Sequence, residues 1–208
     1  MNIDRNVSLR VFSLAAMILA LAFSVQVAGA GHEHHHTPMA MIESVSDDSL
    51  HHLSASWRDH RNQPMTLKDL SGQAVIVTMI YANCQTACPV LVEDVKRLYH
   101  GLDDAQQANT RVLVVSFDAE RDTPEALHRY AIDMGADRPG WHFLTGDESD
   151  IRTIAAVLGI RYRENPSGGF DHSNVIAVLN RQGEIVGRQE GLMQSPERLS
   201  SILRTALN

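Results

Sequence analysis

Two cysteines, Cys84 and Cys88, are the only thiols in this chain of 208 residues. At this spacing the two sulfurs can converge on one soft metal ion, and they are also close enough to form a disulfide. A disulfide-scaffolded secreted domain would contain four or more cysteines, so the pair does not build such a framework. The spacing alone leaves open a metal clamp, a redox dithiol and an inert bridge or pair of small buried side chains.

The cysteines follow residues 74–81, an uninterrupted β-rich apolar run that predicts a central strand buried on both faces. Pro89 suits the first turn of a helix, and Gly101 ends that helix. The pair therefore lies at the carboxyl end of a strand, where open α/β sheets place their sites. Because backbone N–H groups at a helix start stabilise anions, we expect a thiolate at Cys88 to form more readily than in a free cysteine.

The strand and helix pattern then repeats. Apolar strand patterns at 111–117 and 141–145 alternate with helices beginning at Thr123-Pro124 and Asp147, and a hairpin at 174–188 precedes a last helix. This order predicts an α/β, thioredoxin-like fold. We expect a mainly parallel central sheet with right-handed crossovers, helices on both faces, and a C-terminal hairpin plus helix.

The start of the chain has the pattern of an export signal. Residues 1–10 contain two arginines, and residues 11–30 carry no charge and end in Ala28-Gly29-Ala30, small residues that a signal peptidase reads. We expect cleavage after Ala30. The alternative is an uncleaved membrane anchor, because the apolar run is barely long enough to span a bilayer. Both interpretations place the domain outside the cytoplasm, in the periplasm or anchored to the membrane.

Four imidazoles follow the expected cleavage site, at His32, His34, His35 and His36. With two nearby methionines they offer ligands of the kind that copper and zinc accept, and a solvated polar tail is the alternative interpretation. A tract that precedes the folded domain is not preorganised, so binding must overcome its conformational entropy. The sequence predicts an auxiliary metal-capture site that is weaker than the thiolate site.

Length and composition limit the class of protein. A hydrophobic content of 44% with 21% charged residues is typical of a globular domain, and the formal charge of −7 disfavours nucleic acid as a partner. The length fits one domain plus a targeting segment. We divide the chain into a signal peptide or anchor (1–30), a flexible lead-in containing histidine and methionine (31–56), and a thioredoxin-like domain (57–208). A short helix is expected near 48–57.

Histidine is the unusual residue, with eleven copies, all beyond position 31. His172 lies between a glycine-rich loop and the first strand of the hairpin, where chain direction brings it to the sheet edge that carries the cysteines. A lone histidine is more often a surface residue than a ligand, so His172 taken alone is ambiguous. The other histidines of the domain are scattered, and we expect most to be solvated: His51, His52, His60, His100, His128 and His142.

Three stretches of the chain, in the same order, resemble the Sco/SenC family: residues 80–89, residues 115–124 and Asp171-His172-Ser173. The members of this family are copper-binding, thioredoxin-like proteins that assist cytochrome oxidase assembly. The resemblance extends from Trp57 to the C-terminus. It implies a Sco domain with copper as its cofactor.

The resemblance also implies roles for single residues. Cys84 and Cys88 match the family's two copper thiolates, His172 matches its copper imidazole, and Asp118 matches the acidic residue beside the site. From the residues alone, Asp118 suits either orienting the site or capping the following loop. Residues 120–122 are interpreted as loop-forming surface residues. Two thiolates and an imidazole suit Cu(I) and can hold Cu(II), whereas zinc usually takes a fourth ligand.

The function implied is that of a copper chaperone, a carrier rather than an enzyme, that delivers copper to cytochrome oxidase subunit II or another exported cuproprotein. The alternative is a thiol:disulfide reductase whose redox-active dithiol, Cys84 and Cys88, keeps the copper-binding cysteines of a target reduced and is itself served by a thiol-disulfide reductant. A reductase of this fold typically has a cis-proline where this chain has Asp171-His172-Ser173, which favours metal binding. A peroxidase-like enzyme needs activating Thr and Arg residues that the sequence does not place.

Overall fold

The computed structural model describes residues 48–208. The expected signal peptide or anchor (1–30) and His32, His34, His35 and His36 lie outside the described residues, so these expectations remain predictions. Within the part of the chain that is described, no helix is both long enough and apolar enough to cross a membrane.

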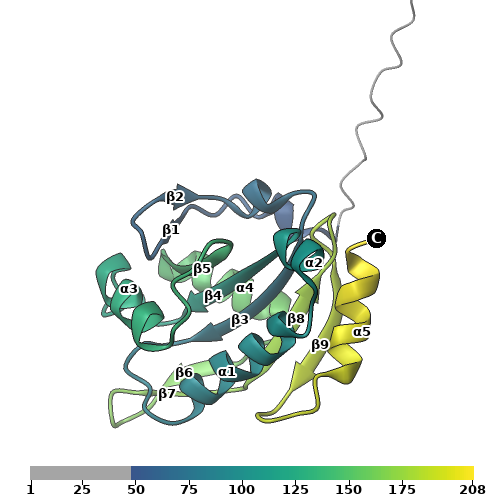
Figure 1. The fold of residues 1–208 in the computed structure, drawn as a ribbon. Coiled ribbons are helices and arrows are strands. Elements are labelled where there is room, and N and C mark those ends of the chain that lie inside the picture. Colours follow the sequence, from purple (N-terminus) through teal and green to yellow (C-terminus); the bar gives the residue numbers. More distant parts are fainter. Residues whose placement is uncertain (1–47) are drawn as a thin grey trace, which may run out of the picture. The chain divides into compact units, whose positions relative to one another are not determined.

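A seven-stranded sheet forms the centre of the domain, in the spatial order β2-β1-β5-β4-β3-β8-β9 (Figure 1). Its strands are β1 (Trp57–Asp59), β2 (Pro64–Met65), β3 (Ala74–Ile80), β4 (Thr110–Ser116), β5 (Trp141–Gly146), β8 (Val175–Leu179) and β9 (Ile185–Glu190). The β3/β4 and β4/β5 pairs are parallel, and the other pairs are antiparallel. The expected parallel arrangement thus holds for the three central strands, and the sheet as a whole is mixed.

Helices cover both faces of the sheet, as the alternating pattern predicts (Figure 1). One buried cluster packs the sheet against α1 (Ala87–His100), α3 (Pro124–Asp133) and α5 (Glu197–Ala206), and the cluster on the opposite face includes α4 (Glu148–Leu158). All seven residues of β3 are buried, which explains its uninterrupted apolar run. A short α2 (Asp104–Ala108), which the sequence analysis did not predict, connects α1 to β4.

The segment before β1 is part of the packed domain. The expected short helix is reduced to a 3-10 turn, η1 (Leu50–His52), and a second 3-10 turn, η2 (Leu67–Leu70), follows β2. Leu50 and Ala55 lie in the core, and the Leu50 amide donates to the Gly183 carbonyl at 2.9 Å. Residues 50–55, which the sequence analysis placed in the flexible lead-in, are therefore held by backbone pairing to the β8–β9 turn and by burial of apolar side chains.

A second, two-stranded sheet stands apart from the main one. It consists of β6 (Tyr162–Glu164) and β7 (Phe170–His172), which pair antiparallel around a glycine-containing turn. The sequence analysis identified the glycine-rich loop at this turn but not the two flanking strands, because strands of three residues carry too little alternation to be recognised. Ser173 and Asn174 connect its last residue, His172, to β8, which runs antiparallel to β3, so the hairpin ends at the same edge of the main sheet as β3 and β4.

Candidate metal centre

The loop from β3 to α1 holds the first cysteine, and the first turn of α1 holds the second. The Cys84 amide donates to the Tyr81 carbonyl at 3.2 Å and closes a turn, while Cys84 Sγ accepts the backbone N–H of Cys88 at 3.4 Å. Thr86, the residue at the helix N-cap, forms no side-chain capping bond. The sulfur of Cys84 therefore occupies the place of a helix-capping acceptor.

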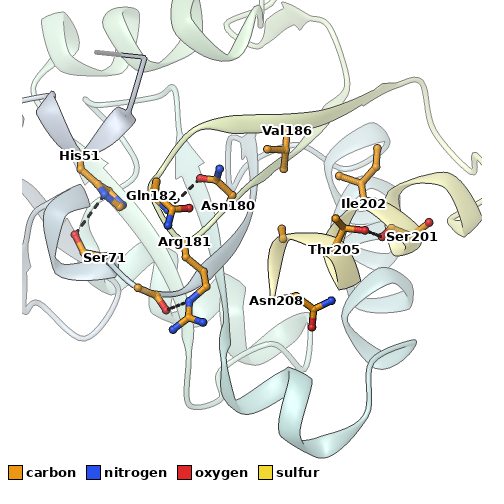
Figure 2. Close-up of a pocket in the computed structure, with 12 residues that line it drawn as sticks. His51, Ser71, Asn180, Arg181, Gln182, Val186, Ser201, Ile202, Thr205 and Asn208 are labelled. Carbon is orange, nitrogen blue, oxygen red and sulfur yellow. Dashed lines mark hydrogen bonds between the residues drawn. The ribbon is translucent and has the colours of Figure 1, made fainter. Parts of the chain in front are cut away.

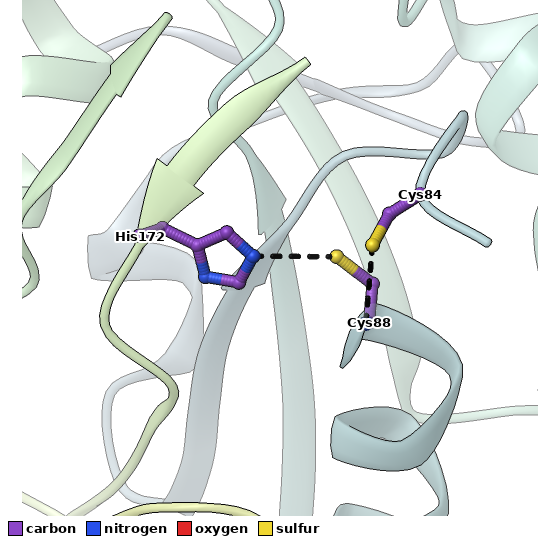
Figure 3. A group of neighbouring side chains, drawn as sticks. All are labelled: Cys84, Cys88 and His172. Atoms are coloured by element: carbon purple, nitrogen blue, oxygen red, sulfur yellow. Dashed lines mark hydrogen bonds between the residues drawn. The ribbon is translucent and has the colours of Figure 1, made fainter. Parts of the chain in front are cut away.

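The third residue of the site is contributed by the end of β7. His172 Nε2 lies 3.8 Å from Cys88 Sγ, and one ligand atom from each of Cys84, Cys88 and His172 lies within 4.8 Å of the others (Figure 3). The cysteines are 6% and 0% exposed, and His172 is half-buried. The structure thus brings together, from a loop, a helix and a small hairpin, the three residues that the sequence singled out.

The imidazole of His172 presents a lone pair to the sulfurs. Its Nδ1 lies 3.3 Å from the carbonyl oxygen of Ser173, which can only accept a hydrogen bond, so Nδ1 carries the proton. Burial lowers the pKa of His172, although the Ser173 carbonyl and the Asp171 carboxylate act in the opposite direction. The neutral ring therefore leaves Nε2, the atom that faces Cys88, free to bind a metal.

The two thiols differ in acidity, and the expectation for Cys88 is wrong. Burial raises the pKa of Cys88 well above its ordinary value. Burial acts in the same direction on Cys84, but backbone N–H groups of Cys88, Thr86 and Ala87 stabilise its thiolate, and the pKa of Cys84 is lowered. The amides at the start of the helix point at the sulfur in the preceding loop, while Cys88, inside the first turn, has its sulfur in the apolar core.

Asp118 caps its own loop, one of the two roles the sequence left open. It is 3% exposed, and its carboxylate accepts the side-chain Nε–H of Arg121 at 2.6 Å and the Arg121 amide at 3.3 Å. The carboxylate that touches the cysteine loop is Asp122, which accepts the Ala82 amide at 2.8 Å and the Ser116 hydroxyl at 2.5 Å. Asp122 is 2% exposed, so its interpretation as a surface residue is wrong.

A cluster of four aromatic side chains lies beside the imidazole, and two of them contact it, a feature that the sequence analysis missed. The Phe117 ring lies 4.9 Å from the His172 ring, and the Tyr81 ring lies 6.3 Å from it. Phe170 packs against both Tyr81 and Phe117, and Tyr162 stacks on Phe117. Only 5% of the residues in the chain are aromatic, so their clustering at the ends of β3, β4 and β7 is the signal that was available.

The scattered histidines do not join this site, and the expectation that most are solvated is wrong. His51 and His60 are buried, His128 and His142 are half-buried, and His52 and His100 are exposed. His60 accepts the Phe143 amide at 3.1 Å through Nδ1 and bonds the Asp137 carboxylate at 3.2 Å through Nε2. Both ring nitrogens of His60 are therefore engaged by neighbouring groups.

A cavity of about 760 Å³ lies at the opposite end of the sheet (Figure 2). The turn between β8 and β9 lines it together with α5 and the Ser71-Gly72 turn, and His51 and Arg181 are among its residues. None of Cys84, Cys88 and His172 borders it. The cavity is therefore separate from the cysteine and histidine cluster.

Comparisons with known proteins agree on the family. The SCO1/SenC family matches residues 51–208. The chain is 24% identical over 144 residues to the SCO1 protein homolog of Bacillus subtilis, an alignment that covers 68% of this chain and 74% of the relative. The chain therefore belongs to the SCO1/SenC family.

Solved structures confirm the thioredoxin-like Sco fold. ScoI from Arabidopsis thaliana, solved with copper bound, gives a TM-score of 0.64 at 20% identity, covering 74% of this chain and 95% of that one. BsSco, described as a member of the Sco family of cytochrome c oxidase assembly proteins with a disulfide switch, gives a TM-score of 0.64 at 23% identity, covering 73% and 90%.

Proposed function

We propose that this protein binds copper through Cys84, Cys88 and His172 and acts as a copper carrier. The observation that supports the proposal most strongly is the convergence of two sulfurs and one imidazole nitrogen within 4.8 Å. Two thiolates and a neutral imidazole form a soft, low-coordinate donor set that suits Cu(I). The related ScoI of Arabidopsis thaliana has copper bound, which fits the same donor set.

The proposed task is delivery of copper to cytochrome oxidase subunit II or to another exported cuproprotein. Its support is the description of BsSco as a cytochrome c oxidase assembly protein, together with the position of the site. His172 borders an open hollow of about 420 Å³ that Arg161 and Asp171 also line. Because His172 lies at an accessible edge, a side chain of a partner protein can replace it on the copper ion. The apolar run at 11–30 supports an exported protein.

A thiol:disulfide reductase is the second candidate, and the unequal acidity of the two thiols favours it. Burial acts to raise the pKa of both thiols. The pKa of Cys88 is raised, whereas backbone N–H groups outweigh burial at Cys84 and lower its pKa. This difference suits an attacking thiolate at Cys84 and a buried resolving thiol at Cys88. In that role the pair reduces a disulfide formed by the copper-binding cysteines of a target, and an external reductant restores the dithiol.

The ligand set is tested with His172→Ala. Because Nε2 supplies the nitrogen donor, we expect this variant to bind Cu(I) more weakly and to change the electron paramagnetic resonance spectrum of bound Cu(II), with the fold retained. His100→Ala, which removes an exposed imidazole at the far end of α1, is the matched control and should leave the spectrum unchanged. A wild-type spectrum in His172→Ala would show that another residue is the third ligand.

The two functions are separated with a target domain that carries two copper-binding cysteines. A carrier loads the reduced target with copper and leaves an oxidised target unchanged. A reductase converts the oxidised target to its dithiol without copper, and His172→Ala should retain that activity because both thiols remain. Counting the target's free thiols and its bound copper in the same reaction decides between them.

A further inference from the structure

The hairpin that carries His172 has little stability of its own. β6 and β7 have three residues each, and they pair with one another in the register Tyr162↔His172 and Glu164↔Phe170. An isolated two-stranded hairpin is marginally stable in water at best. Its contacts with the rest of the domain therefore decide where the His172 imidazole lies.

Part of that contact is aromatic. The Tyr162 ring stacks on Phe117 at 5.1 Å with an interplanar angle of 16°, and the Phe170 ring meets Phe117 edge-on at 5.1 Å. Such contacts hold the hairpin near the ends of β3 and β4 through burial of apolar surface, which is largely non-directional. They are suited to keeping the hairpin in place but not to fixing its exact position.

Arg121 supplies directional contacts to this hairpin, in addition to the hydrogen bond between the Tyr81 side chain and the Phe170 backbone. Its Nε donates to Asp118 Oδ2 at 2.6 Å, and its Nη1 donates to the Gly168 carbonyl oxygen at 2.7 Å. The guanidinium also lies over the Phe170 ring, 5.6 Å from its centroid, and Nη2 is 3.8 Å from Glu164. A planar guanidinium offers donors in fixed directions, so it can bridge two acceptors at a defined spacing.

Hydrogen bonds hold both ends of this bridge. Asp118 is buried, and its backbone amide donates to the Ser116 hydroxyl oxygen at 3.0 Å. Gly168 lies in a turn closed by Asn165, whose side-chain oxygen accepts the amides of Ser167 and Gly169, both at 3.1 Å. The turn satisfies its own N–H groups and turns the Gly168 carbonyl toward Arg121.

We infer that Arg121 is a positioning residue of the metal centre: it ties the turn of the β6–β7 hairpin to the buried Asp118 carboxylate and thereby sets the distance between His172 and Cys88. The sequence analysis placed Arg121 among surface loop residues, and its side chain is indeed 44% exposed. Its effect on the site passes through the hairpin, because it contacts none of the three candidate ligands in the described structure. Only the copper readouts of this inference rest on the proposed function.

The first test uses metal-free, reduced protein and Arg121→Gln. Hydrogen exchange of the amides in residues 162–172 should become at least about tenfold faster, because the turn of the hairpin loses its link to Asp118, while exchange in β3 and β4 should stay unchanged. Arg152→Gln is the matched control, since Arg152 and Arg121 both line a second hollow, beside Tyr162 and Phe170, but Arg152 pairs with Glu148 within α4. Unchanged exchange of residues 162–172 in Arg121→Gln would overturn the inference, whatever the protein binds.

Arg121→Lys separates the bridge from the charge alone. A lysine keeps a positive charge beside Asp118 but cannot donate in two fixed directions to Asp118 and Gly168. We expect its exchange rates to resemble those of Arg121→Gln. Wild-type exchange in Arg121→Lys would contradict a role for the two-ended bridge.

The copper readout compares three proteins. If Arg121 positions His172, Cu(II) bound to Arg121→Gln should show a second spectral species that resembles His172→Ala, and Cu(I) affinity should fall by about tenfold. A changed spectrum in His172→Ala with a wild-type spectrum in Arg121→Gln would overturn the positioning role and leave the proposed function standing. Wild-type spectra in both would instead reject His172 as a ligand.

A further variant covers the case in which Arg121→Gln does not fold because it leaves the buried Asp118 charge without its partner. Asp118→Asn/Arg121→Gln removes both charges and still lacks the bridge. It should show the same faster exchange in residues 162–172. Exchange at the wild-type rate in the double variant would overturn the inference.

Discussion

The chemistry of the cysteine pair depends on where the start of α1 directs its N–H groups. The sequence around Cys84 and Cys88, with an apolar run before them and a helix start at Pro89, is sufficient to predict that both lie at the carboxyl end of β3, and the structure places them there. It was not sufficient to predict which sulfur the helix stabilises. That depends on the turn at residues 81–84, which carries the Cys84 sulfur back toward the first amides of α1.

This asymmetry predicts different alkylation profiles for the two thiols. Because the pKa of Cys84 is lowered by backbone N–H groups that outweigh its burial, and burial raises the pKa of Cys88, Cys84 should react with iodoacetamide at lower pH than Cys88. Mass spectrometry of the metal-free, reduced protein between pH 6 and 10 measures both rates. In Cys84→Ser the remaining thiol should react only at alkaline pH. Faster reaction of Cys88 at neutral pH would contradict this assignment.

At the scale of elements, the long buried segments were predictable and the short ones were not. The two seven-residue, largely buried strands β3 and β4 and the Thr123-Pro124 start of α3 appear as the sequence predicts. β1, β2, β6 and β7 have two or three residues each, and they exist because longer neighbours or aromatic packing hold them. Their positions depend on tertiary contacts, which the periodicity of the sequence does not predict.

The pairing of β1 with β5 depends on a close approach that only glycine allows. A Cβ at Gly146 would lie 2.7 Å from the ring of Trp57, which is 1% exposed and cannot move aside. We expect Gly146→Ala to lower the free energy of unfolding by about 1–3 kcal/mol in urea denaturation. Gly101→Ala is the control, because its nearest neighbour would be at 3.4 Å, and it should change stability by less than about 0.5 kcal/mol. Equal effects of the two variants would contradict the role assigned to Trp57.

On the scale of the whole molecule, burial of neutral histidines links stability to pH. Burial lowers the pKa values of His51, His60 and His142, as it does for His172. The unfolded chain takes up protons below about pH 6.5, while these groups in the folded chain resist protonation until lower pH. Stability is therefore lost as pH falls through the histidine range.

We expect the free energy of unfolding of the metal-free, reduced protein to fall by about 1 kcal/mol or more between pH 7 and pH 5. Urea denaturation at a series of pH values measures it. His60→Gln, which replaces a buried imidazole with a side chain that does not titrate, should show a shallower pH dependence even if it is less stable throughout. A wild-type stability that is flat or rises toward pH 5 would contradict the burial of neutral imidazoles.

The central claim, that the two thiols and one imidazole bind copper, is tested most directly by Cu(I) titration of the full chain against a chromogenic chelator. Because a cysteine sulfur binds copper as a thiolate and not when it is oxidised to a disulfide, the reduced protein should take up about one tightly bound Cu(I) at this site. The protein with an oxidised pair, and the Cys84→Ser/Cys88→Ser variant, should lose that equivalent. Copper held by the histidines at 32–36 is distinguished by repeating the titration below pH 6, where imidazoles are protonated. Equal uptake of tightly bound Cu(I) by the reduced and the oxidised protein would contradict the account.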